Sequence, residues 1–179
     1  MQQDSQIGFI MANPLALKAP RQPKMEHTIY QYPDPIVNVS RSSNASWFIP
    51  SDAEWVKAAY FDPTKGGNVD GGFWRWPTMS DVPPTGEAPP GGNNSANYDW
   101  VFSHTIDVGS YPGSVNFYGT LDQVGNAWEL VEDIYDIGTR VQRGDSYSGW
   151  YGSGNINHYV GTGGGTFTGD QDTGFRVAY

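Results

Sequence analysis

Few residues of this chain have the types and spacing that catalysis needs. The 179 residues include no cysteine and only 3 histidines, which excludes disulfides, thiolate nucleophiles and sulfur-ligated metals. Glu132, Asp133 and Asp136 lie close together and can be interpreted as a paired general acid and base. A solvated acidic turn explains the same spacing, because nothing indicates a cleft that would raise one pKa. No segment resembles the nucleophile elbow of a serine hydrolase.

A second candidate site is the segment 144–170, whose composition favours binding. Most of its residues are Gly, Ser, Tyr or Asn. Antibody contact loops have this composition, because aromatic side chains supply rigid contact area and small polar side chains supply adaptable hydrogen bonds. The predicted ligand contacts are Tyr147, Ser148, Trp150, Tyr151, Asn155, Asn157, His158 and Tyr159. A glycine-rich surface loop without a ligand is the alternative interpretation.

Charge and hydropathy exclude two classes of partner. The formal net charge is −9, and the 10 basic residues are scattered, so we expect no nucleic-acid partner. No stretch approaches the roughly 20 apolar residues of a membrane span. The first residues have neither the basic nor the apolar region of a signal peptide, so no export signal is expected.

The elements that must position these residues are short. With 23 Gly and 13 Pro, the composition predicts an irregular, helix-poor domain. One helix is well specified: Ser51 and Glu54 form a capping box, Trp55, Ala58 and Ala59 share one face, and Asp62-Pro63 ends it. Short strands are predicted at 105–108, 128–132, 140–143 and 174–178. Segment 64–95 is predicted to be a long loop, either functional or pinned to the core by its aromatic residues.

The first 45 residues differ from the remainder of the chain. They contain five prolines and no clear periodicity, so we expect residues 1–45 to form an extended or mobile arm, with one possible strand at 36–39. Residues 46–179 are then the folded domain.

Four segments, in this order and spacing, resemble the formylglycine-generating, sulfatase-modifying-factor family: 48–59, 118–130 (with Val-Gly-Asn-Ala-Trp-Glu), 140–147 (Arg-Val-Gln-Arg-Gly-Asp-Ser-Tyr) and 173–178 (Thr-Gly-Phe-Arg-Val-Ala). The resemblance implies an α+β, irregular C-type-lectin-like fold. Family members carry a further strand and helix upstream, so the fold is expected to be incomplete at the N-terminus, as a short form or a fragment. If part of the sheet is missing, one sheet edge is exposed, and we expect that a partner chain could cover it.

The resemblance also implies what chemistry is missing. Cysteine oxidases of the family use two active-site cysteines that bind copper(I), in the stretch after an Arg-Gly-Gly-Ser motif. Aligned on Arg143-Gly-Asp-Ser, these positions correspond to Gly149 and Gly154. Because a soft metal needs soft ligands, no copper and no oxidase chemistry are expected. The prediction is a pseudoenzyme that binds a protein or peptide through segment 144–170. An enzyme with thiol-free oxidoreductase chemistry and a truncated member with little activity are the alternatives. An extracytoplasmic location is implied by the family alone.

Calcium sites of the family map onto residues that could still bind a hard cation. The first site corresponds to Asp122, Gly125, Ala127 and Glu129, and the second begins at Asn97 and the Tyr98 carbonyl. An ordinary acidic turn is the alternative to the first site. Arg176 is expected to form a structural ion pair, with Asp133 as a candidate partner.

Overall fold

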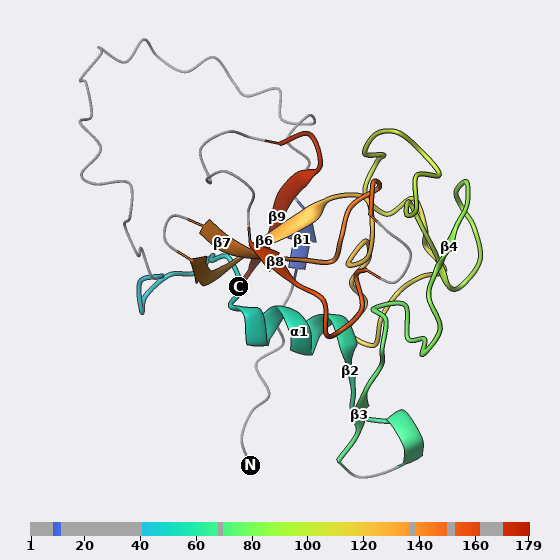
Figure 1. The fold of residues 1–179 in the computed structure, drawn as a ribbon. Helices are drawn as coiled ribbons and strands as arrows, with labels where there is room; N and C mark the ends of the chain where they lie inside the picture. The colour runs from blue at the N-terminus through green and yellow to red at the C-terminus, as the bar shows by residue number, and fades with distance from the viewer. Residues whose placement is uncertain (1–8, 12–40, 68–69, 137–138, 150–152, 162–169) are drawn as a thin grey trace.

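A five-stranded sheet forms the centre of the computed structural model, which describes residues 9–11, 41–67, 70–136, 139–149, 153–161 and 170–179 (Figure 1). The strand order is β1-β9-β6-β7-β8. All neighbours are antiparallel except β6 and β9, which are parallel. The strands are β1 (Phe9–Met11), β6 (Trp128–Asp136), β7 (Thr139–Arg143), β8 (Val160–Gly161) and β9 (Thr173–Ala178).

The helix α1 (Asp52–Tyr60) lies beside this sheet and begins where the sequence predicts. The Ser51 side chain accepts from the Glu54 backbone N–H, and the Glu54 carboxylate accepts from the Ser51 N–H, so the predicted capping box is confirmed. Trp55, Ala58 and Ala59, which the sequence places on one face, are all buried. One core cluster joins Trp55, Ala59 and Tyr60 of α1 to Val131 and Val141 of the sheet.

The other half of the domain consists mainly of loops, around β4 in Figure 1. This half contains two two-stranded sheets. One pairs β2 (Phe61–Asp62) with β3 (Gly72–Phe73), and the other pairs β4 (Thr85–Gly86) with β5 (Ser95–Ala96). A short 3-10 helix, η1, spans Lys65–Gly67. A second core cluster of Trp76, Ala96, Tyr98 and Val124 packs this half together. Segment 64–95 therefore contains short elements and is pinned by the buried Trp76, as one of the two interpretations predicted.

Three of the predicted strands are confirmed, with small differences at their ends, as β6, β7 and β9. The strand predicted at 105–108 is wrong. The Asn126 side chain accepts from the Ile106 N–H and donates to the Ile106 carbonyl, so a side chain satisfies the backbone groups that a strand neighbour would bind. The strand predicted at 36–39 lies outside the described residues.

Strand β1 comes from the segment that the sequence predicts to be an arm. Phe9 pairs with Ala178 and Met11 with Arg176, so β1 covers the edge of β9 that faces away from β6. The chain itself thus covers this edge of β9, while a partner chain at a sheet edge stays a prediction. Within the described residues, no helix is both long and apolar enough to cross a membrane.

Candidate ligand-binding site

Arg143, at the end of β7, holds the backbone of a segment that contains several of the predicted contact residues. Its guanidinium forms two hydrogen bonds with the Asp52 carboxylate, at 2.6 and 2.7 Å. It also donates to the carbonyls of Ile156 and His158, both at 3.1 Å. The guanidinium therefore ties segment 156–158 to the first turn of α1.

Tyr147 lies beside an aromatic residue that the sequence analysis did not single out. The Trp100 N–H donates to the Tyr147 carbonyl at 2.8 Å, and the two rings meet edge to face with centroids 5.9 Å apart. The Tyr147 N–H in turn donates to the Asn126 carbonyl. Trp100 is 60% exposed, so its ring offers apolar area on a backbone that is held in place.

Ser148 is anchored to the start of the last strand through Asp172. The hydroxyls of Ser146 and Ser148 donate to the same Asp172 oxygen at 2.7 and 3.1 Å, and these two hydroxyls lie 2.9 Å apart. The Tyr147 side chain is thus flanked by two serines whose hydroxyls point toward Asp172. Neither Asp172 nor Trp100 belongs to a motif, so no local signal identifies them.

The next predicted contacts form a turn. The Asn155 side chain accepts from the Asn157 N–H, and the Asn155 carbonyl accepts from the His158 N–H. The His158 ring lies against Trp128, with centroids 5.8 Å apart. Burial and the nearby Arg143 charge lower the pKa of His158. A neutral imidazole is therefore the form that this position favours.

Tyr159 belongs to a separate group of side chains. Its ring lies 6.1 Å from Tyr135 of β6 and beneath the Arg143 guanidinium, at 4.9 Å. The structure thus places Tyr147 and Ser148 with Trp100, and Tyr159 with Tyr135, in two groups. Trp150 and Tyr151 lie outside the described residues.

Both positions that correspond to the family's cysteines are buried glycines next to Asp145. A Cβ atom at either Gly149 or Gly154 would lie within 3.2 Å of the Asp145 side chain. Asp145 itself is fully buried, and burial raises its pKa to about 6, although the Ser153 hydroxyl donates to it. The sequence analysis did not single out Asp145. It could have been found from the motif Arg-Gly-Asp-Ser, because the family pattern has a second glycine where Asp145 stands.

Glu129, predicted as a calcium ligand, has a different partner. Arg176 donates to both of its carboxylate oxygens, and the Trp55 indole N–H donates to one of them at 2.6 Å. A cation already neutralises this carboxylate, so Glu129 does not fit a calcium site in this arrangement. The ion-pair partner predicted for Arg176 was wrong: Asp133 instead accepts from the Asp52 N–H at 2.5 Å.

The other predicted ligands of the first site are also engaged. The Asp122 carboxylate accepts from the Gly109 N–H at 2.6 Å, and its pKa is raised, mainly by burial. The Gly125 carbonyl accepts from the Ala127 N–H at 2.8 Å. Among the described residues, no group of three or more His, Asp or Glu side chains could hold a metal ion.

Asn97 fits a cation better. Its amide donates to the carbonyl of His104 and to the side-chain oxygen of Asn126, which fixes the amide orientation. Its own side-chain oxygen is buried and has no hydrogen-bond partner. The Tyr98 carbonyl accepts a bond of 3.4 Å from the Val101 N–H. An unpartnered buried oxygen is the kind of atom that a bound cation or water satisfies.

The acidic residues interpreted as a general acid and base have structural partners. Glu132 accepts from the Arg41 N–H at 2.6 Å, and Asp133 binds the first turn of α1. Asp136 ends β6, where its carbonyl accepts from the Thr139 hydroxyl. These contacts give each of the three residues a structural role.

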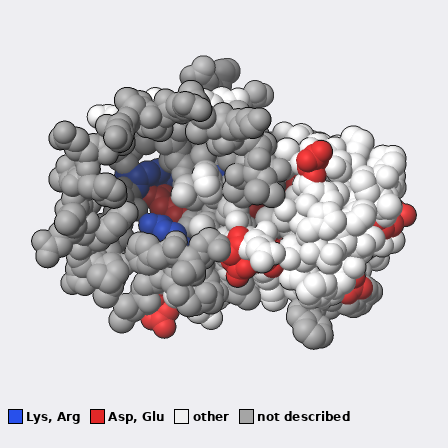
Figure 2. Space-filling view, turned by 90° about the horizontal axis from the view of Figure 1, so that it is seen from above, with Lys and Arg blue, Asp and Glu red and all other residues white. Residues whose placement is uncertain are grey.

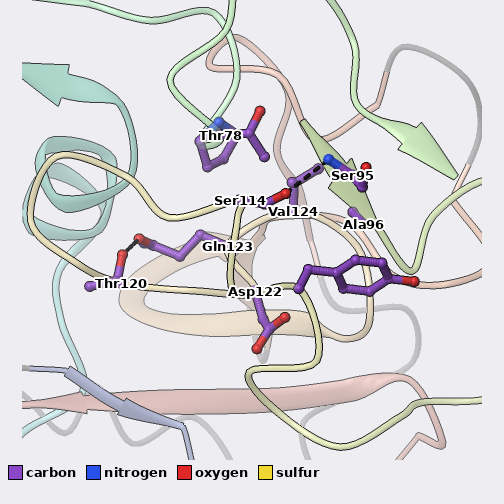
Figure 3. Close-up of a pocket in the computed structure, with 10 residues that line it drawn as sticks. Thr78, Ser95, Ala96, Ser114, Thr120, Asp122, Gln123 and Val124 are labelled. Carbon is purple, nitrogen blue, oxygen red and sulfur yellow. Dashed lines mark hydrogen bonds between the residues drawn. The ribbon is translucent and has the colours of Figure 1, made fainter. Parts of the chain in front are cut away.

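A small polar pocket lies between the loops, and ten residues line it (Figure 3). Gln123 accepts from Asn116 and Thr120, while its amide nitrogen is buried and unpartnered. The Ser114 hydroxyl accepts from the Ser95 N–H on the opposite side. The pocket has room for about one water molecule, so it is too small for a substrate.

The surface charge of the domain is mainly acidic. Seen from above, the loop-rich half shows several acidic side chains and none that are basic among its described residues (Figure 2). The formal net charge of −9 agrees with this view. Such a surface repels polyanions.

Comparisons with solved structures identify the fold. Treponema denticola variable protein 1 matches with a TM-score of 0.51 and 22% identity, over 74% of this chain and 47% of that one. CarF matches with a TM-score of 0.52 and 22% identity, over 76% of this chain and 48% of that one. The chain thus spans about half the length of these proteins. No curated protein matches it.

The sequence gives a family match over most of the chain. A model of the sulfatase-modifying factor enzyme 1-like domain matches residues 18–179. This range begins upstream of residue 46, the domain start predicted from the sequence, which stays a prediction. Because the structure is helix-poor and its neighbours are proteins of this kind, the C-type-lectin-like fold is confirmed. The chain therefore belongs to the family of sulfatase-modifying factor enzyme 1-like domains.

Proposed function

We propose that this domain is a non-catalytic binding module whose protein or peptide ligand contacts the surface around Tyr147. The observation that carries the proposal is the pairing of Tyr147 with the exposed Trp100 on a backbone held by hydrogen bonds. Exposed aromatic rings on a rigid support are typical of residues that dominate binding energy. Ser148 adds a polar group beside them, and the formal net charge of −9 favours a neutral or cationic ligand.

The binding role can be tested with a displayed library of random peptides. We expect the domain to enrich peptides, and we expect W100A and Y147A to weaken a selected peptide by at least tenfold. The matched control is W47A, because Trp47 is also exposed and also packs on a tyrosine, Tyr179. An equal loss in W47A, or no enrichment at all, would contradict the proposal.

The absence of catalysis is a separate part of the proposal. The glycines at 149 and 154 supply no thiol, so a cysteine-containing peptide incubated with the domain and copper should not be converted to formylglycine. Mass spectrometry of the peptide measures the conversion. Turnover above a copper-only control would overturn the non-catalytic assignment.

We also propose that calcium stabilises the domain through Asn97, whose buried oxygen has no partner. Binding to the folded state alone raises the melting temperature as calcium is added. We expect this rise in the wild type and in N157A, an exposed asparagine, and its loss in N97A. No rise at millimolar calcium in the wild type would reject the calcium proposal.

A further inference from the structure

The carboxyl group of Asp145 fills the space that a side chain at position 149 would need. A Cβ atom built at Gly149 would lie 2.1 Å from Oδ2 of Asp145 and 2.2 Å from its Oδ1. Carbon atoms in proteins do not approach oxygen this closely, so any larger residue at 149 requires Asp145 to move. The φ angle of Gly149 is not in the left-handed region, so space alone requires glycine here.

The second glycine borders the same side chain. A Cβ atom at Gly154 would lie 3.2 Å from Cβ of Asp145, 3.1 Å from the Gly144 carbonyl oxygen and 3.0 Å from the Val124 side chain. Its φ of +79° adds a conformational reason for glycine. The Asp145 side chain therefore borders both of the positions that correspond to the family's cysteines.

Local contacts hold Asp145 in this place. The Ser146 N–H donates to one carboxylate oxygen at 2.7 Å, and the Ser153 hydroxyl donates to the other. Asp145 has φ +67°, a conformation that glycine adopts more readily than aspartate. The motif Arg-Gly-Asp-Ser thus carries an aspartate at a position whose backbone suits the glycine of the family pattern.

We propose that Asp145 closes the place that corresponds to the family's copper centre, and that its hydrogen bonds with Ser146 and Ser153 hold the backbone next to Tyr147 of the binding surface. On this proposal, the glycines at 149 and 154 and the aspartate at 145 depend on one another, because the Asp145 side chain needs the space that the glycines leave. This inference deepens the proposed binding function and rests on it. Restoring two cysteines alone would not restore a metal site, because the Asp145 carboxyl group occupies the space of a side chain at 149 and the Asp145 Cβ borders that of a side chain at 154.

A double-mutant cycle of melting temperatures tests the steric claim. We expect G149A to lower the melting temperature by roughly 5 °C, because it overpacks the site. In a D145G background the same substitution should cost much less. The matched control is G174A, where a Cβ atom would meet nothing within 4 Å. If G149A is as mild as G174A, or if its cost is the same in both backgrounds, the claim is wrong.

Copper binding tests the same claim by a second route. We expect G149C/G154C with D145G to bind one Cu(I) at least tenfold more tightly than G149C/G154C with Asp145 retained, in competition with a coloured Cu(I) chelator. Equal affinity of the two, or no binding by either, would contradict the role of Asp145. Failure of the proposed function is distinguishable, because it shows as formylglycine production or as the absence of peptide binding by the wild type.

Discussion

The Arg176 guanidinium and the Glu129 carboxylate form an ion pair in which both side chains are 1% exposed. Arg176 also donates to the Leu121 carbonyl, and Glu129 also accepts from the Trp55 indole. The pair thus joins β9, β6, α1 and the turn before β6. It gives the Gly-Phe-Arg and Trp-Glu motifs a structural reason, because each supplies one charge of a buried ion pair.

Removing one charge of this pair should destabilise the domain strongly. We expect E129Q and R176M each to lower the free energy of unfolding by about 3–5 kcal/mol, because the remaining charge stays buried. Urea denaturation followed by tryptophan fluorescence measures the change. The control is K65M, which removes the exposed pair of Lys65 with Asp81 and should cost no more than about 1 kcal/mol. Similar values for the three variants would refute the assignment.

Local signals in the sequence predict the elements well. The helix begins at its capping box, and β6, β7 and β9 lie where short strands were predicted, because capping and strand signals act within a few residues. The strand predicted at 105–108 fails for the opposite reason. Its backbone partner is the side chain of Asn126, which lies 20 residues from Ile106 in the chain.

The site was less accessible to prediction. Composition identifies Tyr147 and Ser148, but Trp100 joins them through a contact between segments far apart in the sequence. Glu129 shows a similar limit: a motif predicts a cation at this carboxylate, whereas the cation present is the side chain of Arg176. Asp145 could have been found, because it replaces a glycine of the family pattern.

The capping box at the start of α1 should make a measurable contribution to the free energy of unfolding. Ser51 satisfies the Glu54 N–H, and alanine at this position leaves that donor without its side-chain partner. We expect S51A to cost about 1 kcal/mol of stability, which corresponds to a fall of roughly 2–4 °C in melting temperature. S103A replaces an exposed serine and should change little. A melting temperature of S51A equal to that of S103A would show that the cap contributes nothing.

Asp145 should make stability depend on pH in a defined direction. Burial raises its pKa to about 6, so the folded chain holds a proton on this carboxyl group that the unfolded chain releases near pH 4. The free energy of unfolding therefore falls as pH rises from about 4 to about 6, and the cost persists above that range. The shift corresponds to about 3 kcal/mol at neutral pH.

The isosteric variant D145N removes this titration. We expect its stability relative to the wild type to increase between pH 4 and 6 and then to stay constant, in urea denaturation at each pH. D107N controls for the change in net charge, because Asp107 is exposed. A relative stability of D145N that is flat across this range, or that falls as pH rises, would mean that the Asp145 carboxyl group is ionised without cost. That result would also contradict the claim that burial of the Asp145 carboxyl group raises its pKa.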